Sequence, residues 1–104
     1  MMKFIMLTEV FERGQDFLHQ RDPDNESRFG LREIIINSHH IVSIRDASIF
    51  KSKIEACNWS GLEDLDKRVY FCKIYLSSAS GTSSIVYVAG DIHTIKDTIG
   101  TLDN

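Results

Sequence analysis

The sequence has few of the features that place a protein in a special class. Of its 104 residues only two are cysteines and one is proline. Cys57 and Cys72 do not form a Cys-x-x-Cys pair, so the sequence gives no sign of a disulfide framework or a zinc site built on cysteine. No apolar run approaches the ~18 residues of a membrane span, and the apolar start meets Glu9 too early for a signal peptide. We therefore expect a cytoplasmic protein with both thiols free.

An excess of basic residues is also absent. Twelve Lys and Arg stand against 15 Asp and Glu, for a formal net charge of −3 and a pI of about 5.7. Proteins that hold nucleic acid by charge need a basic face, so only a local basic patch stays open. The 42% hydrophobic and 26% charged residues are ordinary for a soluble globular protein. We predict a single domain, 1–104, because the length is typical of one domain.

The clearest structural prediction from the sequence is a pair of strands late in the chain. Residues 69–76 are dense in aromatic and β-branched side chains, which favour a pleated, half-buried surface. A hydroxyl-rich segment around Gly81 follows, and residues 85–88 are apolar again. This order predicts two strands joined by a polar turn.

A short helix is predicted next, over residues 91–100. Ile92, Ile95 and Ile99 recur at the spacing of one helical face. Asp91 suits the N-cap, because its carboxylate can accept hydrogen bonds from the first turn. We expect the isoleucine face to pack on the sheet.

Alternating apolar residues predict three earlier strands, at 3–10, 31–37 and 41–45, the last two closely connected. Two polar insertions, at about 12–30 and 46–68, interrupt the pattern. The first contains the only proline and is expected to be a long exposed connection.

The second insertion is predicted to be irregular. Ile49 and Phe50 either extend the third strand or belong to a separate excursion, and residues 61–66 could form a single helical turn.

These elements predict an α+β fold: a small, strongly bent, mostly antiparallel sheet or partial barrel of about five strands, with one short C-terminal helix. A sheet this small has edges, and we expect strand 3–10 or strand 85–88 to be one of them and to pair with a second copy in a homodimer. The predicted core is Ile5, Leu7, Ile34, Ile36, Val42, Ile44, Cys72, Ile74, Val86, Val88, Ile92, Ile95 and Ile99.

The order of apolar segments resembles known small proteins. Ile34-Ile35-Ile36-Asn37 followed by His40-Ile41-Val42-Ser43-Ile44 looks like a strand pair of the small FlbD-type flagellar proteins. The segment from Val88 to Ile95 is similar to the N-terminal half of LytTR-type DNA-binding domains. The matching pieces cover about half of the chain, and the two insertions have no counterpart in either family. The resemblance implies a fold more than a function.

Residues with chemical potential are scattered. His39 and His40 are adjacent, which in a strand would put them on opposite faces, and no His-x-His or His-x-x-x-His spacing supports a metal site. Cys72 lies among apolar residues, where burial raises the pKa of a thiol, and Cys57 is the better candidate for a reactive one. We expect no metal, no cofactor and no catalytic residue.

Two groups of residues are candidates for binding. Residues 77–84 offer hydroxyl groups, and Ser78, Ser80 and Thr82 could hold a phosphate or a ribose, although a plain hairpin loop explains them as well. Arg45, Lys73 and Tyr75 are further candidates for contact with a ligand or a partner. The densest basic group in the sequence comprises Lys51, Lys53, Lys67, Arg68 and Lys73, with Phe50 and Tyr75 nearby. Nucleic-acid binders interleave charge and aromatic rings in this way, but a solvated sheet face is the better explanation.

The sequence favours a non-enzymatic binding or assembly module that engages a protein partner through a sheet edge or its long loops. The alternative is a small-molecule or nucleotide-binding module that uses the Ser77–Ser84 loop, at an oligomer interface if the chain forms one. Nucleic-acid binding and catalysis rank below both.

Overall fold

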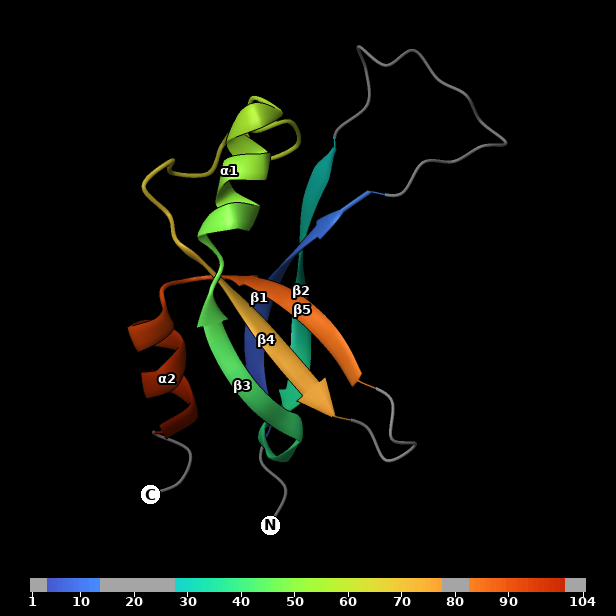
Figure 1. Ribbon diagram of the computed structural model, residues 1–104, viewed down its shortest axis with the longest axis vertical. Coiled ribbons are helices and arrows are strands. Elements are labelled where there is room, and N and C mark those ends of the chain that lie inside the picture. Colours follow the sequence, from blue (N-terminus) through green and yellow to red (C-terminus); the bar gives the residue numbers. More distant parts are fainter. Residues whose placement is uncertain (1–3, 14–27, 78–82, 101–104) are drawn as a thin grey trace, which may run out of the picture.

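One five-stranded antiparallel sheet carries two α-helices in the computed structural model, which describes residues 4–13, 28–77 and 83–100 (Figure 1). This arrangement confirms the predicted α+β fold. No described helix has the length and apolar content to cross a membrane. In chain order the elements are β1 (Phe4–Glu12), β2 (Phe29–Asn37), the 3-10 helix η2 (Ser38–His40), β3 (Ile41–Asp46), α1 (Ser48–Ala56), β4 (Phe71–Ser77), β5 (Ser83–Ala89) and α2 (Ile92–Gly100).

The strand order explains why the sheet is bent. Its strands lie in the order β2-β1-β5-β4-β3, so β2 and β3 are the two edges. These edges follow one another in the chain and are joined only by the three residues of η2. The sheet must therefore curl until its edges meet at η2, as Figure 1 shows where β2 ends and β3 begins. The result is a partial barrel that stays open between its edges.

The sequence-based choice of edge strands is wrong. β1 pairs with β2 over nine residue pairs and also with β5, through Glu9 and Val88. β5 pairs with β4 on its other side. The pairing of β1 with β5 joins distant parts of the chain, so no local sequence pattern predicts it. This pairing places both strands inside the sheet.

The inner face of the sheet holds the main hydrophobic core. Its buried residues are Ile5, Leu7, Ile36, Cys72, Ile74 and Val88 from the strands and Ile95 from α2. Asp91 caps α2 as predicted, since its carboxylate accepts a hydrogen bond of 2.7 Å from the Thr94 amide. That bond lowers the pKa of Asp91. The cap fixes the start of α2 so that its isoleucine face covers the inner core.

Every predicted core residue joins this cluster except Val42, which is 67% exposed. The register of β3 against β4 shifts between Ile41 and Ser43. Such a bulge gives the strand one extra residue, so Ile41 and Ile44 both face inward and Val42 turns to solvent. Simple alternation cannot reveal a bulge, and the prediction for Val42 is wrong for that reason.

A second core lies on the outer face, at the end of the sheet where β3 leads into α1. It consists of Val10, Phe29, Ala47, Ile54, Trp59, Leu62 and Phe71. α1 covers it, although the sequence predicted an irregular insertion over residues 46–68. Ala47, Phe50, Ile54 and Cys57 do recur at helical spacing. The signal was obscured because Ile49 breaks the pattern at 86% exposure and no side chain caps the helix start.

The segment after α1 is tied to the start of β2. Asn58 and Trp59 adopt left-handed backbone angles (φ 57° and 58°), and the buried Trp59 donates its backbone N–H to Ile54 O at 3.0 Å. The next residue, Ser60, accepts a hydrogen bond of 3.0 Å from the Phe29 amide. Left-handed angles are unfavourable for a bulky residue, so burial of the indole ring must offset this strain.

A substitution at Gly61 tests whether residues 59–62 pack closely on β2. The φ of Gly61 is +90°, and a Cβ added there would lie 1.9 Å from Phe29 O. We expect Gly61→Ala to lower the free energy of unfolding by at least about 3 kcal/mol, because strain and a backbone clash add. Gly100→Ala is the matched control, since no atom lies within 4 Å of its added Cβ. Urea unfolding of both variants measures the difference, and equal stability would contradict the close packing of 59–62 on β2.

Ile95 tests the inner core. It is 2% exposed, and truncation of a buried isoleucine costs about 2–5 kcal/mol. We expect Ile95→Ala to lose that much in urea unfolding while Lys96→Ala, at the neighbouring exposed position, loses little. A loss below about 0.5 kcal/mol would mean that α2 is peripheral to the fold.

Candidate functional site

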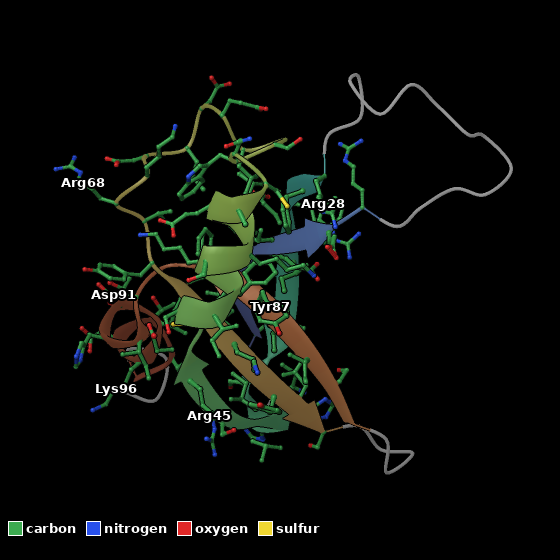
Figure 2. All side chains as sticks on the ribbon, turned by 45° about the horizontal axis from the view of Figure 1, so that its top comes forward. Arg28, Arg45, Arg68, Tyr87, Asp91 and Lys96 are labelled. Carbon is green, nitrogen blue, oxygen red and sulfur yellow. The ribbon has the colours of Figure 1, made fainter. Side chains whose placement is uncertain are left out.

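A hollow of about 470 Å³ opens between α1 and the outer face of the sheet. Residues 9–12 of β1 and the start of α1 line it, together with Lys73, Ile85 and Tyr87. Figure 2 shows Tyr87 beneath α1 and Arg45 on β3. Hollows of this size fall in the range of small-molecule sites.

Three of the predicted binding residues come together beside this hollow. Arg45 pairs directly with Lys73 across β3 and β4, and Tyr75 follows two positions later on the same face. The Arg45 guanidinium carbon lies 6.0 Å and the Lys73 Nζ 5.6 Å from the centroid of the Tyr75 ring. The other three predicted residues, Ser78, Ser80 and Thr82, lie outside the described residues.

Tyr87 belongs to the same site and was missed by sequence reasoning. It pairs with Lys73 across β4 and β5, and its ring lies 5.9 Å from Lys73 Nζ. Phe50 of α1 stacks on Tyr87 at 4.1 Å with an interplanar angle of 10°, and it meets Phe71 edge-on at 5.9 Å. The side of the hollow is therefore a fixed aromatic wall. The sequence alone could not assign Tyr87 to the site, because the register of the β4–β5 hairpin decides which residue lies opposite Lys73.

The glutamates of the hollow are neutralised by nearby cations. Glu12 lies 3.0 Å from Lys53 Nζ and 3.7 Å from Arg28 Nε. Glu9 accepts a hydrogen bond of 2.7 Å from Arg32 Nε. These pairs leave little negative charge to attract a cation.

Arg45 and Lys73, by contrast, have no acidic partner among the residues that the structure describes. No described carboxylate lies within 4.0 Å of either cation, as an ion pair requires. Asp46, next in sequence, also contributes to the lining of the hollow, but strand alternation places its side chain on the face opposite to that of Arg45, beside its register partner Cys72. On the face that carries Arg45 and Lys73, the uncompensated charge is therefore positive.

A different surface lies on the outer face of β1 and β2. Met6 pairs with Ile35 across the two strands, and the two side chains are 58% and 66% exposed. Phe4, on the same face of β1, is 56% exposed, and Leu31, on the same face of β2, is 43% exposed. We call these four residues the apolar surface of the β1–β2 hairpin.

The backbone edge of β2 borders this surface. The Phe29 amide donates away from β1, to Ser60 O, and strand geometry gives every second residue the same direction. The N–H and C=O groups of Leu31, Glu33 and Ile35 therefore point away from β1. β2 has no strand partner other than β1 within the described ranges, so this edge offers unpaired backbone groups.

In the described part of the chain, neither the two adjacent histidines nor a cluster of acidic residues forms a metal site. His39 and His40 are exposed in η2. No three His, Cys, Asp or Glu side chains gather there at metal-binding distances.

The two thiols should differ sharply in reactivity. Burial, with the negative charges of Asp46 and Asp91 as lesser causes, raises the pKa of Cys72 to about 11, and its thiol donates to Gly90 O at 3.3 Å. Cys57 is partly exposed. At pH 8 we expect a thiol reagent such as DTNB to react with one thiol per native chain and with two after unfolding, because only the thiolate reacts. Cys57→Ser should abolish the native reaction, and rapid labelling of two thiols would contradict the burial of Cys72.

The chain was also compared with known proteins. No protein family, curated protein or solved structure matches it. The likeness to FlbD-type and LytTR-type proteins therefore stays a prediction from the sequence. The function must be inferred from the two surfaces themselves.

Proposed function

We propose that this protein is a non-enzymatic binding module that engages a protein partner along the edge of β2. The observation that carries the proposal is the unpaired edge at Leu31, Glu33 and Ile35 beside the apolar surface of the β1–β2 hairpin. An added strand would hydrogen-bond to this edge and extend the sheet. Its side chains would cover apolar groups that are now in contact with water.

The composition of the edge supports this reading. Sheet edges in monomeric proteins are usually short or protected by lysine, proline or a covering element. Among the described residues, cover is found only at the start of β2, where the Phe29 amide donates a hydrogen bond to Ser60 O. On the outer face of β2 the one charged side chain between Leu31 and Ile35 is Glu33. Phe4, Met6 and Ile35 form an exposed apolar patch beside the edge, and such patches are typical of interaction sites.

The outer-face position of these side chains also matters for specificity. Leu31, Glu33 and Ile35 direct both their backbone groups to the edge and their side chains to the outer face. A bound strand would therefore be recognised in two ways: its backbone by hydrogen bonds to the edge, and its side chains by contacts on the outer face. Cys72 does not support a catalytic function, because its raised pKa keeps the thiol protonated at neutral pH.

The test is capture of partners from the native cell by tagged protein. We expect the wild type to retain a specific protein, and Ile35→Lys or Met6→Lys to lose it, because each places a charge where the partner must pack. Ile49→Lys is the matched control: Ile49 is 86% exposed and lies on α1, outside the apolar surface of the β1–β2 hairpin. A partner that binds the wild type, Ile35→Lys and Met6→Lys equally would refute the proposal.

Amide hydrogen exchange locates the contact. In the free protein the amides of Leu31, Glu33 and Ile35 should exchange faster than those of Arg32 and Ile34, which point toward β1. Binding of the partner should slow the first set. Slow exchange of all five amides in the protein alone would mean that a second copy covers the edge, and sedimentation equilibrium would then show the homodimer.

A further inference from the structure

We propose that Arg45 and Lys73 form the anion-binding end of a small-molecule site, with the hollow beneath α1 taking the rest of the ligand. The expected ligand is a small organic phosphate. This site is separate from the edge of β2 and does not depend on the partner proposed there.

The first observation is the placement of two like charges. Arg45 and Lys73 are directly opposite one another on adjacent antiparallel strands, where Cβ atoms are about 4.5–5.5 Å apart. Like charges in this position repel and weaken a sheet. Neither has a carboxylate partner among the described residues. An anion between the two would replace repulsion with two attractive contacts.

The second observation is that aromatic rings lie next to both cations. Both lie over the Tyr75 ring, with Arg45 at 6.0 Å and Lys73 at 5.6 Å from its centroid. Lys73 also lies 5.9 Å from the centroid of Tyr87. Cation–π contacts stabilise a positive charge without neutralising it. The cations are thus held in place while their charge stays available to a ligand.

The third observation is that the positive end adjoins a partly open hollow with both apolar and polar lining. Lys73 lines the hollow of about 470 Å³, together with the stacked Phe50 and Tyr87 and the exposed Ile49 and Ile85. Ligand sites usually combine apolar walls with a few polar groups that fix orientation. The volume is suited to a ligand of about mononucleotide size.

The charge of the site selects phosphate over carboxylate. The glutamates of the hollow are already paired with Lys53, Arg28 and Arg32, so they do not compete for Arg45 or Lys73. A phosphate monoester carries nearly two negative charges at neutral pH, which matches two cations. A guanidinium can also bind two phosphate oxygens at once.

The experiment is a titration followed by two-dimensional amide NMR at constant ionic strength. The probes are adenosine monophosphate, adenosine and inorganic phosphate. We expect the monophosphate to shift the amides of Lys73, Tyr87 and their strand neighbours, inorganic phosphate to shift them with lower affinity, and adenosine to bind at least tenfold more weakly than the monophosphate.

Two substitutions and one control identify the residues. Arg45→Gln and Lys73→Gln should each weaken binding of the monophosphate roughly tenfold or more, because each removes a charge-assisted contact. Lys96→Gln, on the exposed face of α2, should leave the affinity unchanged. Arg45 is exposed, so Arg45→Gln should fold normally, and in chloride buffer it should melt no lower than the wild type because repulsion is relieved.

Three results would overturn the proposal. The first is the absence of any saturable shift in the wild type up to 10 mM of the monophosphate, a concentration chosen on the order of weak ligand binding. The second is equal affinity of the wild type and Arg45→Gln. The third is equal loss in Lys96→Gln, which would indicate a general effect of positive charge.

Discussion

The three-residue link between β2 and β3 is the constraint on which the rest of this structure depends. Because η2 joins opposite edges of the sheet, the strands must curl around the inner core. The link is itself held by Asn37, whose side chain accepts a hydrogen bond of 3.0 Å from the His39 amide. The curl gives the sheet a concave face filled by isoleucines and α2, and a convex face that α1 covers only in part. Both candidate binding surfaces lie on that partly covered outer face.

Local patterns predicted local structure well and long-range pairing poorly. The β4–β5 hairpin, α2 and its Asp91 cap are confirmed, because each depends on residues close in sequence. The strand order is not a local property: the pairing of Glu9 with Val88 decides it. α1 was missed because the exposed Ile49 obscures its helical spacing.

The candidate site shows the same division. Arg45, Lys73 and Tyr75 were identified from charge and aromatic character, and the registers of β3 and β4 bring them together. Tyr87 and Phe50 could not be assigned to the site, because one needs the hairpin register and the other needs α1. The edge of β2 needs the full strand order, since an edge is defined by the absence of a neighbour.

β1 connects the two surfaces. Phe4 and Met6 contribute to the apolar surface, whereas residues 9–12 line the hollow. The surfaces adjoin at one point, because Leu31 of the apolar surface pairs with Val10 of the hollow. Ile35 lies farther away: it pairs with Met6, and at about 3.4 Å per residue Met6 is about 10 Å along the strand from Glu9, the nearest residue of the hollow. That distance exceeds the Debye length of about 8 Å at physiological salt. A change of charge at Arg45 or Lys73 should therefore act on a bound anion without altering contacts at Ile35, so anion binding and partner binding can be tested independently.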